Sequence, residues 1–277
     1  MERDIAPEKI MTILPILHLP SLDSENDIIP SLYQGIHATG GSIVLIPARI
    51  IEGKGQMDAV RAIKKLHDDK RNVHLVLMGT SEPLYRKSIE SYVSRNHIGD
   101  IVHILPFVDT PQTYIKYADV VLNTSRLESF GRSTIEAMYA RVPVVGADNT
   151  ATGHMISSGY NGLTYATGSS NDLSTKIAAI LDDESLRKDI IKGGYHYALS
   201  QYKATQKNLA DFPDILTEVV SQEHVPDIAL AYVCETLNTQ ADNINVGNDT
   251  SASRRDSKVF KIRRIVGKVV RKIRRMI

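Results

Sequence analysis

Short runs rich in Val, Ile and Leu recur along the chain from about Ser42, and stretches with a helical apolar stripe separate them. The runs show little alternation of apolar and polar residues, which is typical of parallel strands covered on both faces. Strands that alternate with amphipathic helices favour one parallel sheet between two helical layers. The predicted fold class is therefore α/β, a doubly wound parallel sheet. The predicted strands are SIVLIPA (42–48), VHLVLM (73–78), IVHIL (101–105), DVVLN (119–123) and VPVVGA (142–147).

Two amphipathic helices are predicted between the first three runs. The helix in GQMDAVRAIKKLHDD (55–69) carries a stripe of Met57, Val60, Ile63 and Leu66. The helix in EPLYRKSIESYVSRN (82–96) carries a stripe of Leu84, Ile89 and Val93. Further helices are predicted near 171–181, 183–200 and 204–221, and Pro213 should bend or break the last of these.

Composition is that of a soluble globular chain, with 42% hydrophobic and 23% charged residues among 277. The single cysteine, Cys234, excludes an internal disulfide. The opening MERDIAPEKI lacks the pattern of a signal peptide, and no apolar run approaches the roughly 20 residues that span a bilayer. We therefore expect a cytoplasmic protein without a transmembrane helix.

Two glutamates, Glu128 and Glu136, lie eight residues apart in RLESFGRSTIEAM (126–138), directly after a predicted strand. A close carboxylate pair first suggests glycoside hydrolysis. In a continuous helix, eight residues at about 1.5 Å each would separate the two Cα atoms by roughly 12 Å. Glycosidase carboxyl groups stand only about 5–9.5 Å apart. The spacing therefore argues against a hydrolase pair, although a loop before Gly131 would bring the side chains closer.

The alternative is a ligand site in the crevice above the carboxyl ends of the strands, where open α/β sheets bind ligands. Ser129 to Gly131 would form the turn into a helix, and the first backbone N–H groups of that helix would bind an anion. Glu136, one turn into the helix, could accept hydrogen bonds from a ribose diol. Taken alone, the spacing favours two solvated charges on a helix surface.

Several motifs in order make the chain resemble glycosyltransferase family 4, over roughly residues 6–220. The stretch from Glu128 to Glu136 matches the Glu-x(7)-Glu motif of that family, and EAM and PVVGAD follow it. Upstream, PARIIEGKGQ matches the Arg…Lys-Gly signature at Arg49, Lys54 and Gly55. Downstream, ISSGYNGLTY resembles the Gly-x-Asn-Gly turn. The resemblance implies a retaining enzyme of the GT-B fold, in which two Rossmann-like lobes are joined, and this chain resembles the carboxy-terminal, nucleotide-sugar-binding lobe.

The resemblance also implies roles for individual residues. Arg49 and Lys54 would bind the diphosphate and stabilise the negative charge that grows on it as the sugar departs. Glu128 would hold a hydroxyl of the donor sugar and Glu136 the ribose hydroxyls. The co-substrate is expected to be a UDP- or GDP-sugar, with no metal and no other cofactor. The remaining predicted contacts with the donor are Ser129, the Phe130–Gly131 backbone, and the main chain of Val108 beside the base.

Two positions depart from the family pattern. The family usually has a small residue where Arg141 stands in MYARVP, and often Glu where His154 stands in TGHMI. Both are expected near the site, so the donor preference of known members does not transfer. His154 is equally well explained as a surface histidine.

Residues 1–41 are expected to be a remnant of the linker between the lobes, with one strand in KIMTILPIL (9–17). The sequence contains no amino-terminal acceptor lobe, so the chain is expected to be a fragment, half of a split enzyme, or inactive. The nucleotide-sugar lobe is predicted over 42–220 and a polar, flexible linker over 221–257.

The last segment, KVFKIRRIVGKVVRKIRRMI (258–277), is predicted to be a basic amphipathic helix. It holds nine Lys/Arg and no acid, and its apolar residues recur every three or four positions. This pattern favours a helix lying on anionic lipid at the inner face of the cell membrane, and the alternatives are a seam to a partner helix and a solvated or disordered tail. A nucleic-acid target is not expected, because base stacking needs aromatic residues and only Phe260 is present. The apolar residues are Val259, Ile262, Val266, Val269, Ile273 and Met276.

The leading hypothesis is therefore the donor-binding half of a retaining glycosyltransferase that acts on a glycan or lipid-linked acceptor in surface polysaccharide synthesis. The alternative is a non-catalytic nucleotide-sugar-binding module that docks on a membrane or on a separate acceptor-binding lobe. A dinucleotide-binding Rossmann protein is disfavoured, because PARIIEGKGQ follows the first strand in place of a Gly-x-Gly-x-x-Gly turn.

Removing residues 258–277 tests the membrane hypothesis. The truncation lowers the net charge from +1 to 1 − 9 = −8, so the shortened chain should be repelled by anionic vesicles that the full chain binds. Salt should weaken the full chain's binding without abolishing it, because salt screens the charges but not the apolar stripe. Co-sedimentation at low and high salt measures this. Equal binding to neutral and anionic vesicles would favour the partner-helix alternative.

Overall fold

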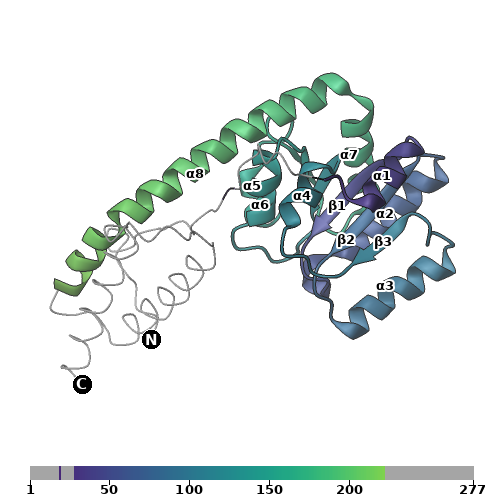
Figure 1. Ribbon diagram of the computed structural model, residues 1–277, viewed down its shortest axis with the longest axis horizontal. Coiled ribbons are helices and arrows are strands. Elements are labelled where there is room, and N and C mark those ends of the chain that lie inside the picture. The colour runs from purple at the N-terminus through teal and green to yellow at the C-terminus, as the bar shows by residue number, and fades with distance from the viewer. Residues whose placement is uncertain (1–18, 20–27, 222–277) are drawn as a thin grey trace. The chain divides into compact units, whose positions relative to one another are not determined.

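A six-stranded parallel sheet forms the centre of one unit of the protein (Figure 1), in a computed structural model that describes residue 19 and residues 28–221. The strand order is β3-β2-β1-β4-β5-β6. The chain divides into two units, Leu17–Tyr202 and a second made of Met1–Ile16 with Lys203–Ile277, and the sheet belongs to the first. The strands are β1 (Ser42–Pro47), β2 (Val73–Met78), β3 (Val102–Leu105), β4 (Val120–Asn123), β5 (Val144–Ala147) and β6 (Leu163–Tyr165).

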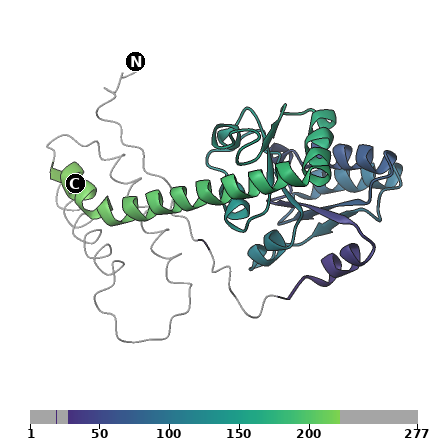
Figure 2. The ribbon, with the colours of Figure 1, turned by 90° about the horizontal axis from the view of Figure 1, so that it is seen from above.

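Helices follow the strands along the chain and cover both faces of the sheet. Figure 2 shows α1, in purple, on the other side of the strands from the blue helices that follow β1 and β2. The helices are α1 (Ser31–Ala38), the short 3₁₀ turn η2 (Glu52–Lys54), α2 (Gln56–Asp68), α3 (Pro83–Arg95), α4 (Pro111–Lys116), α5 (Arg132–Tyr139), α6 (Ala151–Met155), α7 (Ser170–Asp182) and α8 (Glu184–Ser221).

Alternate residues of the strands β1 to β5 pack into two separate cores, one on each face, whereas β6 contributes to only one of them. In β1, Val44 and Ile46 pack with α2, α3 and α7, whereas Ile43 and Leu45 pack with α1, α4 and α5. All four side chains are buried. A strand buried on both faces needs no polar positions, which is why the sequence shows continuous apolar runs. The predicted doubly wound parallel sheet is therefore confirmed, and its five predicted strands are all present.

The order of the strands reverses direction between β1 and β4. These strands are neighbours, paired at Val44–Val120 and Leu45–Val121. From β1 the chain continues into α2 on one face, and from β4 it continues into α5 on the other. The two loops diverge at the carboxyl edge of the sheet, and such a divergence leaves a crevice.

The stripe predicted for α3 is wrong at one position. Ile89 is fully buried and Val93 packs against the same core, but Leu84 is 78% exposed. Five residues of helix turn by about 500°, so Leu84 and Ile89 cannot share a stripe. Tyr85, four residues before Ile89, contacts the core in its place.

Other elements were missed or divided differently by the sequence patterns. The strand β6 is only three residues long, and α1, α4 and α6 have eight, six and five, so each is shorter than the window over which a repeating apolar pattern can be recognised. The α8 helix runs from Glu184 to Ser221 without the expected interruption after residue 200 or at Pro213. No helix of residues 28–221 has both the length and the apolar character to cross a membrane. The predicted strand at 9–17, nearly all of the linker 221–257 and the basic helix 258–277 lie outside the described residues.

A matched pair of substitutions on α3 tests this packing. Ile89→Ala removes a fully buried side chain and should lower the free energy of unfolding by about 2–5 kcal/mol. Leu84→Ala on the same helix should change it by less than about 0.5 kcal/mol, because that side chain is in solvent. Urea unfolding monitored by circular dichroism measures both. Similar losses in the two variants would contradict the observed orientation of α3.

Candidate active site

A cavity of about 380 Å³ opens at the carboxyl edge of the sheet, where β1 and β4 diverge. Its walls come from the ends of β1, β2 and β4, the segment after β3, and the first turns of α4 and α5. Five of the eight predicted site residues line it: Arg49, Lys54, Val108, Glu128 and Glu136. These five residues, which are spread along the sequence from Arg49 to Glu136, therefore lie around one cavity, as expected for a crevice at the carboxyl ends of the strands.

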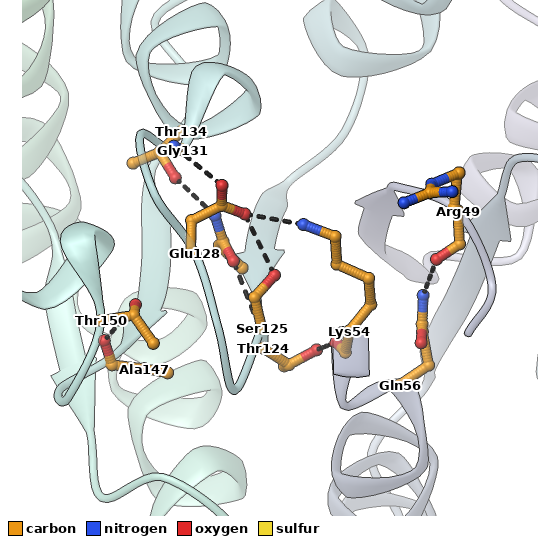
Figure 3. Close-up of polar contacts among 11 residues, drawn as sticks. Arg49, Lys54, Gln56, Thr124, Ser125, Glu128, Gly131, Thr134, Ala147 and Thr150 are labelled. Atoms are coloured by element: carbon orange, nitrogen blue, oxygen red, sulfur yellow. Dashed lines mark hydrogen bonds and ion pairs between the residues drawn. The ribbon is translucent and has the colours of Figure 1, made fainter. Parts of the chain in front are cut away.

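Arg49 follows β1, and its side chain is exposed to solvent at the cavity wall. The backbone of Arg49 is fixed by a hydrogen bond, because Gln56 Nε2 donates to the Arg49 carbonyl oxygen at 2.7 Å. Gln56 is fully buried and its Oε1 atom has no partner among the described residues. Figure 3 shows the Arg49 guanidinium on the other side of the Lys54 ammonium from Glu128.

Lys54 and Glu128 form an ion pair across the cavity, with Lys54 Nζ 2.8 Å from Glu128 Oε2. The two side chains are only 23% and 15% exposed, so water screens this pair less than a surface pair. Ser125 Oγ also donates to Glu128 Oε2, at 3.2 Å, and the Gly131 N–H donates to Oε1, at 3.1 Å. Figure 3 shows these donors around the carboxylate. The family resemblance implied that Lys54 and Glu128 contact different parts of a ligand, and in the structure they bind each other.

These contacts decide the protonation of Glu128. Burial by itself raises the pKa of its carboxyl group, but the hydrogen bond and charge of Lys54 and the N–H groups of Gly131 and Phe130 lower it below the ordinary value. Glu128 is therefore a charged group held in a fixed orientation.

Glu136 lies in a different environment on the same cavity wall. It is half-buried one turn into α5, and among the described residues no side chain donates a hydrogen bond to it. Burial raises the pKa of Glu136, and the positive charge of Arg132 offsets only part of that effect. Its carboxylate therefore lacks the donors that Glu128 has.

The turn into α5 depends on Gly131, the residue before the first helical position. Its φ of 71° is left-handed, which glycine adopts without steric cost. A Cβ there would also stand 3.0 Å from Thr152 Oγ1, a buried hydroxyl without a partner in the described part of the chain. Arg132 and Ser133 follow and line the cavity. The N–H groups of a first turn have no partner within the helix, so they are available to an anion.

Three predicted site residues do not line the cavity. Ser129 is exposed, Phe130 packs against the core on the α5 face, and the Gly131 N–H is used by Glu128. Arg141 and His154 also lie outside the cavity wall. Both are exposed, and Arg141 has a left-handed φ of 60° and stacks its guanidinium 4.6 Å from the ring centroid of Tyr195.

Sequence reasoning missed several lining residues. Thr80 and Phe107 follow strands that it identified, so their position after a strand end was a usable signal. Arg132 lies between Glu128 and Glu136, where the motif predicted a role only for the backbone N–H groups that open the helix. No signal marked Gln112, because α4 itself was not predicted.

Within residue 19 and residues 28–221, no three His, Cys, Asp or Glu side chains gather into a group that could hold a metal ion.

Comparisons with known proteins agree on one class. The family model "Glycosyl transferases group 1" matches residues 34–197, more than half of the 277 residues. A capsular polysaccharide biosynthesis glycosyltransferase of Staphylococcus aureus is 25% identical over 53% of this chain and 38% of its own. An N,N'-diacetylbacillosaminyl-diphospho-undecaprenol alpha-1,3-N-acetylgalactosaminyltransferase of Campylobacter jejuni is 31% identical over 57% of this chain and 40% of its own.

Solved structures share the fold. The Anabaena protein HepE, crystallised with UDP and glucose, superposes with a TM-score of 0.63 at 23% identity, over 70% of this chain and 53% of that one. The Rossmann-like sheet thus matches glycosyltransferase structures of the GT-B fold. The chain spans less than half the length of the curated relatives that it matches.

Opposite stability effects are expected from the two glutamates. Glu128 has a lowered folded-state pKa, so its charge stabilises the fold above the unfolded value of about 4.3, and this is lost as the pH falls through the folded pKa. Glu136 has a raised pKa, so its contribution is present below the unfolded pKa and is lost as the pH rises through the folded one. At pH 7, Glu128→Gln should lower the Tm and Glu136→Gln should raise it.

Thermal unfolding between pH 7 and pH 4 checks these signs. Both differences from the wild type should shrink as the pH falls. Glu90→Gln, on the exposed surface of α3, is the control and should change the free energy of unfolding by less than about 0.5 kcal/mol at each pH. Tm shifts of the same sign for Glu128→Gln and Glu136→Gln would contradict the assigned environments.

Proposed function

Because the chain belongs to the Glycosyl transferases group 1 family, we propose that it is the donor-binding half of a retaining glycosyltransferase of the family 4 type. The observation that carries this proposal is the composition of one cavity. The side chains of Arg49, Lys54 and Arg132 line it together with the first turn of α5 and two glutamates in unlike environments. A nucleotide-diphosphate sugar has an anionic centre and hydroxyl groups on both sides of it, which fits this set.

The diphosphate is proposed to lie between Arg49, Lys54 and the first turn of α5. Arg49 offers a planar fork of donors and Lys54 a point charge. The N–H groups of Arg132 and Ser133 add the positive end of a helix dipole. As the bond from the sugar to the diphosphate breaks, negative charge grows on the diphosphate, and these fixed groups stabilise it without rearrangement.

The hydroxyl groups are proposed to divide between the two glutamates. Glu128, charged and fixed in orientation, would accept from a hydroxyl of the donor sugar. Glu136, which lacks donors, would accept from the ribose. The base would lie against the Val108 main chain, with the neighbouring Phe107, 63% exposed, at the same wall. Phe130 and Gly131, whose N–H groups bond to Glu128, would act on the sugar through that carboxylate, whereas Ser129 is exposed outside the cavity wall and is not part of the proposed contacts.

The donor and acceptor classes are extended from the similar proteins. HepE was crystallised with UDP and glucose, which supports a UDP-sugar, and a GDP-sugar remains the alternative. The relatives from Staphylococcus aureus and Campylobacter jejuni are named for a capsular polysaccharide and a lipid diphosphate. A glycan or lipid-linked acceptor in surface polysaccharide synthesis is therefore proposed. The acceptor would be held by a separate lobe, and the basic segment 258–277 would hold the chain at the inner face of the membrane.

Nucleotide titration of the full chain tests the phosphate contacts. Arg49→Ala and Lys54→Ala should each weaken UDP or GDP binding by about 1.5–3 kcal/mol, since each removes a charge-assisted hydrogen bond. The affinity for the nucleoside without phosphates should change little. Lys65→Ala removes a cation that does not line the cavity and is the control. Isothermal titration calorimetry measures the affinities of the wild type and the three variants for each ligand, and unchanged UDP and GDP affinities in both cavity variants would remove the phosphate role.

A further inference from the structure

Asp58, the third residue of α2, is a buried carboxylate that the proposed chemistry does not use. Its side chain is 1% exposed. Its side-chain partners among the described residues are two arginines: Arg126 at 3.3 Å and Arg61 at 3.9 Å. A buried carboxylate with two such long contacts gains little for the stability of the fold, because taking the charge out of water is costly.

Arg126 reaches Asp58 from the loop between β4 and α5. It lies two residues before Glu128, and its backbone N–H donates to the carbonyl oxygen of Gly53 at 2.9 Å. Its guanidinium Nη2 lies 3.4 Å and 3.3 Å from the two oxygens of Asp58. The loop between β4 and α5, residues 124–131, is called the Glu128 loop. Its residue Arg126 thus contacts the segment that carries Lys54 at two points, Gly53 and Asp58.

Two further contacts hold the same two segments together. Thr124 Oγ1 donates to the Lys54 carbonyl oxygen at 2.7 Å. Gly55, with a left-handed φ of 66°, lies so close to Thr124 that an added Cβ would stand only 2.1 Å from the Thr124 carbonyl oxygen. The two backbones are therefore in direct contact beneath the Lys54–Glu128 ion pair.

We propose that Asp58 and Arg126 form a positioning pair that sets where Lys54 and Glu128 stand in the donor cavity. The pair lies outside the cavity wall and touches no part of the proposed ligand. It acts through the contact of the two loops, because movement of Arg126 would carry Glu128 away from Lys54. This inference rests on the proposed function, since the ligand that it affects is the diphosphate bound by Lys54.

A double-mutant cycle with UDP, or with GDP if that is the ligand bound, tests the positioning role. Arg126→Gln in the full chain should weaken binding about three- to tenfold, a usual size for coupling between residues that share contacts. In a Lys54→Ala background the same change should have less than about a twofold effect, because the residue through which it acts is gone. A general loss of fold stability would weaken binding equally in both backgrounds. Calorimetric titration supplies the four affinities.

Arg61→Gln is the matched control. Arg61 is the other arginine beside Asp58, but it lies on α2, and its ion pair and ring contact in the described part of the chain are with Asp58 and Tyr92, not with the Glu128 loop. Its removal should leave UDP affinity unchanged. If Arg126→Gln does not fold, Asp58→Asn replaces it, since the amide keeps the shape and removes the charge that attracts the guanidinium.

The outcomes separate the two proposals. If the wild-type chain binds neither UDP nor GDP, or Lys54→Ala has no effect, the proposed function fails and the positioning role with it. The positioning role alone is overturned if Lys54→Ala weakens binding but Arg126→Gln does not. It is also overturned if Arg126→Gln has the same effect in both backgrounds, or if Arg61→Gln weakens binding as much.

Discussion

The close approach of two backbones, at Gly55 and Thr124, is the constraint on which the site depends. The neighbouring strands β1 and β4 send their helices to opposite faces of the sheet, so the segments after them must part. They are in direct contact at one point, where a Cβ on Gly55 would stand 2.1 Å from the Thr124 carbonyl oxygen. Lys54 lies next to that point on one segment, and Glu128 lies four residues beyond it on the other. The contact keeps the two segments close enough for the 2.8 Å ion pair between Lys54 and Glu128.

The ion pair brings together two opposite charges that would otherwise both be unpaired in the cavity. Lys54 favours the charged form of Glu128, and hydrogen bonds from the Ser125 hydroxyl and the Gly131 N–H hold the carboxylate in one orientation. A diphosphate bound near Lys54 would add negative charge beside Glu128. The proposed donor therefore has to supply a hydroxyl donor to Glu128 at the same time as an anion to Lys54. A sugar linked directly to a diphosphate does both, whereas a free phosphate does only one.

Periodicity predicted the elements whose side chains repeat over several turns or several strand residues. The α2 helix, 13 residues long, packs Val60, Ile63 and Leu66 into the core as its pattern required. The three-residue strand β6 and the five-residue helix α6 have no repeat to detect, and tertiary contacts alone define them. The error at Leu84 has the opposite origin, because three apolar residues were joined into a stripe whose spacing does not fit 3.6 residues per turn.

Five of the eight residues predicted for the site line the cavity, but the contacts between them were not predictable from the sequence. The motif spacing and the strand ends placed Arg49, Lys54, Glu128 and Glu136 at one edge of the sheet. The sequence could not indicate that Lys54 binds Glu128. The two residues are 74 positions apart, and the distance between them depends on how closely their two loops approach each other in the fold.

The two glutamates show most clearly what the fold adds to the motif. In sequence they are equivalent carboxylates, eight residues apart. In the structure one has its pKa lowered by an ammonium group and two N–H groups, and the other has its pKa raised by burial. A carboxylate that has lost water without gaining donors is stabilised most by a ligand that brings them. Two adjacent ribose hydroxyls would supply such donors to Glu136. The unlike environments of the two carboxylates thus give a physical reason for assigning them to different parts of one ligand.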